Sequence, residues 1–363
     1  MCIRDSGKDI EAGIPLIDDT AYSVPKYHFN YKAACCFASR YYLFMQDWGN
    51  AIKYATMALT SNPSSLLRDY SAIAALPKGT SRHQEYVNSA STANFLLQAA
   101  TSNSGLLFDW YSTAGRYSHG KLQGIYETVQ PKKGGPWGSS VTFKAPHAVL
   151  ASSGKYVLPR TWRVFQYTDP VAGTGFNKAI SVLFTSEEAL LNRAEAYIMK
   201  MNEDPTALDK ALEDINLYAA NLFSAGFKSM TEASIIKWAT ETYPDYSELY
   251  VGKTSVSSPQ TLNPKKKLHA APYNTLEEGG PQESMLQALI FMRRYQFLHE
   301  GMRWFDTRRF GITVYRYLLD EDAETVVQIT DQISDENGTA DPRRALQLPA
   351  DVIAAGLTPN PRK

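Results

Sequence analysis

Apolar residues recur at helical spacing near the start of the chain and predict a pair of helices there. The first helix begins near Asn30 and has apolar positions every three or four residues up to Met45, and the second covers residues 48–59. Pro63 follows, and proline cannot continue a helix. Because the link is so short, the two helices must pack antiparallel. The small residues of this hairpin, residues 28–63, match the second half of a tetratricopeptide unit.

A second helical hairpin is predicted over residues 185–223, again from apolar residues at helical spacing. Ser186 is the expected N-cap of its first helix, and Glu187 and Glu188 in the first turn complement the helix dipole. Pro205 opens the second helix, because proline fits the first helical position. Two such hairpins predict an α-α superhelical scaffold.

The C-terminal part, residues 283–363, is predicted to hold further helices and a tail. One long helix covers residues 283–300 and stops at Gly301, since glycine favours the end of a helix. After a joint at residues 304–305, helix is predicted to continue over residues 306–319.

Two stretches between the helical parts have the composition of ordered loops. Residues 103–175 are rich in glycine, serine, proline and aromatic residues, and residues 157–167 are expected to supply a strand. Long ordered loops are usually functional, because a simple connection needs far fewer residues. Residues 255–280 form a second insertion, in which the lysines at 265–267 are interpreted as a solvated face. We therefore predict one mainly α domain with irregular loop and short-strand insertions.

The charge balance excludes several classes of protein. The chain has 37 Lys plus Arg and 37 Asp plus Glu, so its formal net charge is zero. A sequence-independent nucleic-acid binder needs a clustered excess of basic residues, and so does polybasic attachment to a membrane. The balanced charge therefore argues against both classes. The sequence has no run of 18 or more apolar residues, so no transmembrane helix is predicted. Aromatic residues make up 12% of the chain, which is more than a core requires, because every buried tyrosine hydroxyl must find a partner.

The common motifs of catalysis are incomplete in this sequence. The nucleophile motif GxSxG is absent, and residues 173–178 lack the spacing of a phosphate loop. Glu187 and Glu188 diverge on a helix, whereas a glycosidase needs two carboxyl groups that flank one bond. We therefore predict no catalytic residue and no cofactor.

Metal-binding patterns are equally weak. His299 lacks the second histidine, four residues later, that a zinc helix requires. Asp335, Asn337 and Gly338 faintly resemble a calcium loop, and they are interpreted as a solvent-exposed linker. No metal site is predicted.

A dense group of charged residues lies near the predicted C-terminal joint. Its members are Arg293, Arg294, Glu300, Arg303, Asp306, Arg308 and Arg309. The group could hold an anion, or it could be a partly buried ion-pair network with arginine forks on Glu300 and Asp306. Trp304 and Phe305 lie within it and favour the network, because arginine packs well on aromatic faces.

The same region resembles the hallmark of a known family. LQAL at 286–289 and RRYQFLHEGMRWFDTRRFG at 293–311 resemble the C-terminal hallmark of the SusD/RagB family, although Gln296 stands where many members have glutamate. Three further stretches agree in the same order, residues 32–63, 185–197 and 346–362. The residues matched to the hallmark, which we interpret as structural, are Arg294, Glu300, Arg303, Trp304, Asp306 and Arg309.

This resemblance implies a location, a partner and a ligand class. Members are surface lipoproteins of Bacteroidota that cap a SusC-like TonB-dependent transporter on the extracellular face of the outer membrane. They capture oligosaccharide, or in some cases peptide, without catalysis. Members are longer at the N-terminus, so this chain resembles their C-terminal two thirds, without the lipid anchor expected of the full-length protein. The opening residues MCIRDS resemble translated sequencing adapter.

Aromatic side chains in the loops are the candidates for a ligand platform. A sugar ring stacks its C–H face on Trp or Tyr, while polar side chains at the rim meet its hydroxyls. The candidates are Trp110, Tyr111, Tyr117, Trp137, Trp162 and Tyr167. Trp137 is the first choice, because no helix or strand periodicity accounts for it. For each candidate, the alternative is burial in a satellite core.

Three functional hypotheses remain open at this point. The first is oligosaccharide binding for uptake, with peptide as the alternative ligand. The second is a scaffold or lid that makes only protein contacts with the transporter. The third, an enzyme, requires two acids that converge across a cleft.

Overall fold

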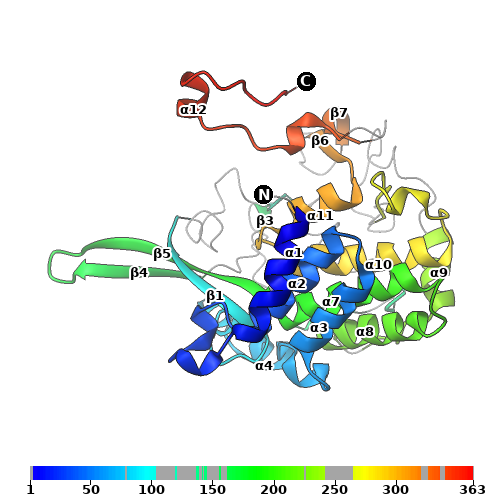
Figure 1. Ribbon diagram of the computed structural model, residues 1–363, viewed down its shortest axis with the longest axis horizontal. Helices are drawn as coiled ribbons and strands as arrows, with labels where there is room; N and C mark the ends of the chain where they lie inside the picture. The colour runs from blue at the N-terminus through cyan, green and yellow to red at the C-terminus, as the bar shows by residue number, and fades with distance from the viewer. Residues whose placement is uncertain are drawn as a thin grey trace.

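The chain forms a helical body from which a long β-hairpin projects (Figure 1). The computed structural model describes residues 3–77, 80–103, 119–120, 136–138, 141, 143–144, 155–156, 162–224, 226–241, 265–319, 326–335 and 340–362. Among the predicted sites, Trp110, Tyr111, Tyr117, Asn337 and Gly338 lie outside these residues, as does most of the 103–175 insertion.

Both predicted helical hairpins are confirmed. The first consists of α2 (Tyr31–Phe44) and α3 (Trp48–Leu59), and the second of α7 (Ser186–Lys200) and α8 (Ala207–Leu222). Helix α3 packs against α7, so the two hairpins lie side by side. The helices approach closely because small side chains are fully buried on them, namely Ala51, Ala55, Ala58, Ala194, Ala211 and Ala219.

Further helices extend this layer. Helix α10 (Pro281–Gln296) packs against α7 and against α9 (Glu232–Glu241), and α11 (Met302–Phe310) follows α10 after a short joint. The other α-helices within the described ranges are α1 (Ile3–Gly13), α4 (Tyr70–Ala75), α5 (Thr80–Tyr86) and α12 (Ala350–Ala354). Short 3₁₀ turns lie at Ile14–Leu16, Asp19–Ala21, Pro25–Tyr27, Pro63–Leu66, Tyr273–Thr275 and Pro342–Arg344.

Side-chain caps set where the paired helices begin. Asn30 caps α2 and Asp47 caps α3, each accepting a backbone N–H at 3.0 Å. The cap of α7 is Thr185, whose hydroxyl accepts the Glu188 N–H at 3.0 Å, and not Ser186 as predicted. Ser186 is buried and donates to the Leu66 carbonyl instead.

The main sheet has three antiparallel strands in the order β1 (Asn94–Thr101), β5 (Thr174–Thr185) and β4 (Trp162–Asp169). The strand predicted within 157–167 is therefore confirmed from Trp162 onwards. Strand β5 runs directly into α7, which ties the base of the projecting hairpin to the helical body. Two smaller pairs are β2 (His119–Gly120) with β3 (Lys155–Tyr156), and β6 (Val314–Leu319) with β7 (Val326–Ile333).

The predictions for the C-terminal helices were partly wrong. The joint lies at residues 297–301, with Gly301 in the left-handed conformation at φ 78°, and Trp304 and Phe305 lie inside α11. Helix α11 then ends at Gly311, also left-handed at φ 67°, where a Cβ atom would lie 2.4 Å from the Ala270 nitrogen. Beyond it the chain forms β6, which contains Val314, Tyr315 and Tyr317, residue types that favour strands.

The solvated face predicted for the lysines at 265–267 is corrected at one position. Lys265 is buried, and its Nζ donates to the Ala239 carbonyl at 2.7 Å. Burial lowers the pKa of this ammonium group, with Glu283 and Glu278 opposing the shift. The lysine therefore fastens the second insertion to the end of α9.

Candidate functional site

Trp137 lies in the hydrophobic core, so its choice as the first platform residue was wrong. Its side chain is 0% exposed. Its ring stacks on Phe291 at a centroid distance of 4.8 Å and on Phe223 at 5.6 Å, and it lies 5.7 Å from Trp238. No face of the indole is left for a ligand, and the alternative of burial holds for this residue.

Of the six predicted platform residues, Tyr167 is the one whose side chain the structure describes as exposed. Trp162 belongs to β4, but its side chain lies outside the described part of the chain, as do Trp110, Tyr111 and Tyr117. Tyr167 is 58% exposed near the far end of the same strand. The description of a site therefore starts from Tyr167.

Tyr167 belongs to an aromatic pair on one face of the β4–β5 hairpin. Phe165 and Tyr167 are two residues apart on β4, so both point to the same face. Their rings meet edge to face, with centroids 4.8 Å apart and an interplanar angle of 74°. Phe165 is 40% exposed, and it was not among the predicted candidates. The period of two that links it to Tyr167 was the signal that could have found it.

Strand register places a polar side chain and a glycine opposite this pair. Asn177 of β5 is opposite Phe165, and Gly175 is opposite Tyr167. A Cβ atom on Gly175 would lie 2.1 Å from the Gln166 carbonyl oxygen, so only glycine fits there. Arg163 lies one further step along the same face of β4. We call Arg163, Phe165, Tyr167 and Asn177 the aromatic face of the hairpin.

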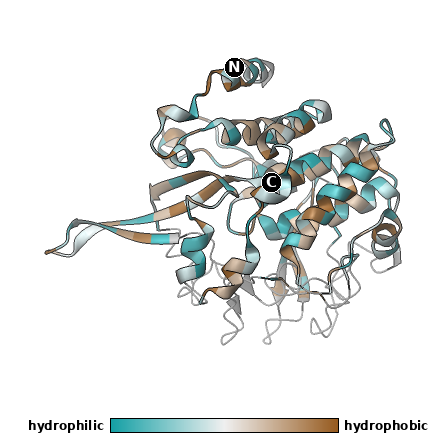
Figure 2. Ribbon diagram, turned by 90° about the horizontal axis from the view of Figure 1, so that it is seen from below, coloured by the Kyte–Doolittle hydropathy of each residue, from teal (hydrophilic) through white to brown (hydrophobic). Residues whose placement is uncertain are grey.

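The opposite face of the hairpin is also partly apolar. Val164 and Phe176 are exposed there, and Lys178 donates to the Thr101 hydroxyl of β1 at 2.8 Å. Val171 at the tip is 99% exposed. Figure 2 shows the hairpin extending well beyond the helical body, with hydrophobic residues along it. The exposed Val164 and Phe176 make this face of the hairpin a second candidate contact surface.

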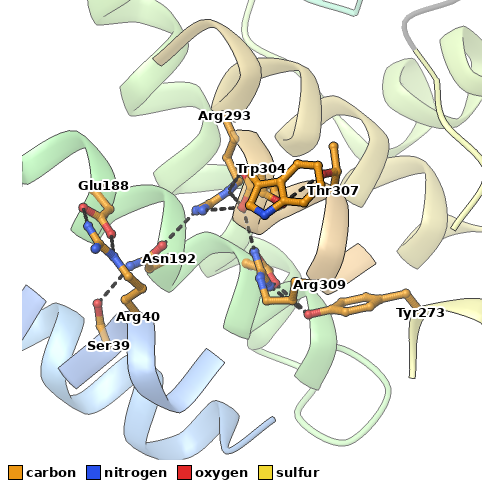
Figure 3. Close-up of polar contacts among 11 residues, drawn as sticks. Ser39, Arg40, Glu188, Asn192, Tyr273, Arg293, Trp304, Thr307 and Arg309 are labelled. Carbon is orange, nitrogen blue, oxygen red and sulfur yellow. Dashed lines mark hydrogen bonds and ion pairs between the residues drawn. The ribbon is translucent and has the colours of Figure 1, made fainter. Parts of the chain in front are cut away.

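The charged group at the C-terminal joint forms a buried network around Arg293. This guanidinium donates to both oxygens of Asp306 at 2.9 to 3.2 Å and to Asn192 at 2.8 Å. Asn192 in turn donates to Ser39 at 3.0 Å (Figure 3). These side chains come from α10, α11, α7 and α2, so one chain of hydrogen bonds joins four helices.

Arg309 forms the second branch of the network. It pairs with Glu195 of α7 and donates to the Tyr273 hydroxyl at 2.8 Å, and that hydroxyl donates to Glu195 at 2.9 Å. Burial raises the pKa of Tyr273, Glu195 adds to the shift, and Arg309 opposes it. The tyrosine therefore stays neutral and acts as a donor.

The two branches meet at Asp306. Burial alone would raise the pKa of this carboxyl, but Arg293 and Arg309 outweigh burial and hold the pKa below its usual value. The charges of Arg293 and Arg309 are thus neutralised inside the fold, and for these two residues the network interpretation is supported over an anion site. Within the described residues, Arg293 and Arg309 lie over the rings of Phe44, Tyr273, Phe297 and Phe310, and not over those of Trp304 and Phe305 as expected.

The other hallmark residues contribute to the joint in different ways. Glu300 accepts the Tyr86 hydroxyl, and the Trp304 carbonyl accepts the Thr307 hydroxyl at 2.8 Å. Arg294 and Arg303 are half-buried on α10 and α11.

The two adjacent glutamates at the start of α7 both form hydrogen bonds inside the fold. Glu188 accepts two hydrogen bonds from Arg40 at 2.6 and 2.7 Å, and Glu187 accepts the Arg68 N–H at 2.9 Å. Both side chains are buried. Their engagement supports a structural role for this pair.

Sequence reasoning missed Glu195 and Asn192 as members of the network. Together with Glu188 they stand at positions i, i+4 and i+7 of α7, which form one helical face. A polar stripe on a helix predicted to be buried was the available signal, because buried polar groups must be paired.

No metal or membrane-spanning element is found in the part of the chain that the structure describes. Those residues include no group of three or more His, Cys, Asp or Glu placed to hold a metal ion. None of the described helices combines the length and the apolar character that crossing a bilayer needs. Asp335, considered above for calcium, accepts from Arg344 at 2.9 Å.

Solved structures of one fold resemble this chain. A SusD superfamily protein from Bacteroides thetaiotaomicron matches with a TM-score of 0.51 and 16% identity, over 99% of this chain and 66% of its own. Another, from Bacteroides vulgatus, matches with a TM-score of 0.50 and 15% identity, over 98% and 64%. No protein-family model matches the sequence, and no curated protein is similar to it. The chain has the SusD-like fold, and it spans slightly less than two thirds of the length of these two proteins.

Proposed function

We propose that this SusD-like chain binds oligosaccharide at the aromatic face of its β4–β5 hairpin, without catalysis. The observation that carries the proposal is the exposed edge-to-face pair of Phe165 and Tyr167 on a projecting element. Large aromatic rings are usually buried, and two adjacent exposed rings indicate a binding surface.

The chemistry of this face suits a neutral polymer. The Tyr167 ring offers a flat apolar surface for the C–H face of a sugar, and its hydroxyl offers a polar edge. Asn177 and Arg163 supply hydrogen-bonding groups beside the rings. The described hairpin projects from the helical body (Figure 1), which lets a polysaccharide bind along its length and not only at its terminus.

Binding without catalysis fits the hydrogen bonding of the two acidic residues that were considered as a catalytic pair. A glycosidase needs one carboxyl group able to donate a proton and a second able to attack or activate water. Glu187 and Glu188, the pair considered from the sequence, are committed to Arg68 and Arg40 inside the fold. None of the four residues that define the aromatic face has a carboxylate, and the nearby Asp169 accepts the backbone N–H groups of Val171 and Ala172 at 2.9 and 3.0 Å.

We further propose that the bound glycan is delivered to a TonB-dependent, SusC-like transporter at the outer membrane. The SusD-like fold supports this part of the proposal, and the resemblance in sequence supplies the expected partner. Co-purification of the two gene products from the source organism tests it. Absence of the transporter from the purified complex under mild detergent would contradict delivery while leaving glycan binding intact.

The experiment for the binding site begins with a glycan array and continues with calorimetry on the best oligosaccharide. We expect Tyr167→Ala to weaken binding about tenfold, because an aromatic contact contributes about 0.5–1.5 kcal/mol beyond buried area. Val171→Ala at the tip is the matched control, and it should bind like the parent chain. Equal affinity of the parent and Tyr167→Ala would remove the aromatic face from the site.

One observation favours a second candidate, a protein or peptide contact. The face opposite Tyr167 also exposes apolar side chains, Val164 and Phe176, which a single glycan platform does not need. A partner that encloses the hairpin would use both faces. An array with no glycan hits, together with transporter binding that Phe176→Asp abolishes, would favour this candidate.

A further inference from the structure

A second apolar surface lies on the helical body, between α2 and α11. Phe37, Tyr41 and Phe44 stand at positions i, i+4 and i+7 of α2, and Met302 and Phe305 of α11 face them across a groove of about 540 Å³. Phe44 is 45% exposed and Phe305 is 46% exposed. We call these five residues, with Arg308 at the rim, the α2–α11 groove.

The charges around the groove are uneven. Arg40 and Arg309 also line it, but each pairs inside the fold, with Glu188 and with Glu195. Arg308 is exposed, and within the described part of the chain it has no ion pair or hydrogen bond. The groove is therefore an apolar surface with one uncompensated positive charge.

The supports of the groove are rigid. The network of Arg293, Asp306 and Arg309 links α11 to α10 and α7, and through Asn192 and Ser39 to α2. A surface held in this way loses little freedom when an occupant binds.

The shape of the groove fits a third helix. An apolar groove lined by side chains of two helices can receive the side-chain ridge of a third helix. From Phe37 to Phe44 the groove runs about 10 Å, which is two helical turns. The occupant therefore needs apolar residues at i, i+3 or i+4, and i+7, with an acidic residue where the helix passes Arg308.

We infer that the α2–α11 groove is the seat of an amphipathic helix from the same protein, in the part of the SusD-like fold that these 363 residues do not span. In each of the two SusD superfamily structures about a third of the length is unmatched, since the match covers 66% and 64% of them. We expect part of that unmatched third to pack on the matched body. The groove offers an apolar surface, a matching shape and a charge for it.

The chemistry of the occupant is tested with synthetic helices on the 363-residue chain. The probe is an 18-residue peptide with leucines at i, i+4 and i+7, flanked by glutamate, and its counterpart has lysine in place of glutamate. We expect the glutamate peptide to bind about threefold more tightly, because a rim ion pair contributes little. Arg308→Glu should reverse this preference. Phe305→Asp should weaken both peptides about thirtyfold, and Leu346→Asp, far along the chain and also exposed, should change neither.

The source of the occupant is tested with a longer protein of the full SusD-like length that contains this chain. Its α2 and α11 amides should be protected from hydrogen exchange, and Phe305→Asp should lower its melting temperature but not that of the 363-residue chain. Peptides that bind with no charge preference, or a groove that stays open in the longer protein, would overturn the inference. If the groove stays open in the longer protein, its occupant would be a separate partner protein. The proposal of glycan binding at the hairpin does not depend on any of these outcomes.

Discussion

Two regions are rich in aromatic and polar side chains, the joint between α10 and α11 and the β4–β5 hairpin. The joint buries and pairs these side chains, whereas the hairpin exposes them. At the joint, Arg293, Asp306 and Arg309 are buried and paired with one another. On the hairpin, Phe165 and Tyr167 pair only as rings at the surface and leave their outer faces open. The same residue types therefore hold the fold together in one region and remain available to a ligand in the other.

The largest expected effect concerns the carboxyl group at the centre of the joint. Asp306→Ala leaves two buried guanidinium groups without their shared partner, which costs about 3–5 kcal/mol in the free energy of unfolding. Urea denaturation followed by circular dichroism measures the loss. Asp331→Asn is the matched control, because its ion pair with Arg343 is exposed, and it should be indistinguishable from the parent chain. A loss below 1 kcal/mol for Asp306→Ala would contradict the account of the joint.

Removal of a core ring should cost nearly as much. Trp137→Ala deletes the indole that stacks between Phe291 and Phe223, and such truncations cost about 3–5 kcal/mol. The same urea experiment measures it, and Trp137→Phe should recover more than half of the loss. A stable Trp137→Ala variant with weakened glycan binding would return Trp137 to the site.

Acidification should affect the joint selectively. Because the folded-state pKa of Asp306 lies below its unfolded value of about 3.9, its contribution to stability is complete above that pH. The contribution is lost as the pH falls through the folded-state pKa. The difference in melting temperature between the parent chain and Asp306→Asn should therefore be constant from pH 7 to about pH 5 and shrink below about pH 4. If this difference in melting temperature grew on acidification, the assigned lowering of the Asp306 pKa would be contradicted.

The smallest expected effect is a local one in the hairpin. Gly175→Ala places a methyl group against the Gln166 carbonyl and should disturb the pairing near Tyr167. We expect faster hydrogen exchange of the β4–β5 amides and several-fold weaker glycan binding, with little change in global stability, because the hairpin projects from the core. Unchanged exchange rates would show that the strands tolerate the methyl group.

The two regions also differ in how far the sequence predicted them. Helix pairs were predictable because their apolar stripes are local, as in α2 and α8. The membership of Asp306 and Arg309 in a network followed from their density along the chain. Their partner Glu195 is more than a hundred residues away, and the polar stripe to which it belongs on α7, with Glu188 and Asn192, was the available signal for it.

Exposure of individual aromatic residues was the least predictable property. Trp137 stands in a glycine-rich segment that has no periodicity, and its partners Phe223, Trp238 and Phe291 come from distant parts of the chain. Whether a ring is buried depends on such contacts, which no local pattern records. Tyr167 was predicted as a candidate. Phe165 was not, because only the strand that contains both residues places its ring on the same face as Tyr167.

One paired measurement tests the contrast between the two regions most directly. It determines both the melting temperature and the oligosaccharide affinity of Tyr167→Ala and Trp137→Phe beside the parent chain. We predict that Tyr167→Ala loses about tenfold in affinity with its melting temperature unchanged, and that Trp137→Phe melts at a lower temperature with its affinity unchanged. Full affinity in Tyr167→Ala, or a loss of affinity in Trp137→Phe, would contradict the assignment of binding to the hairpin.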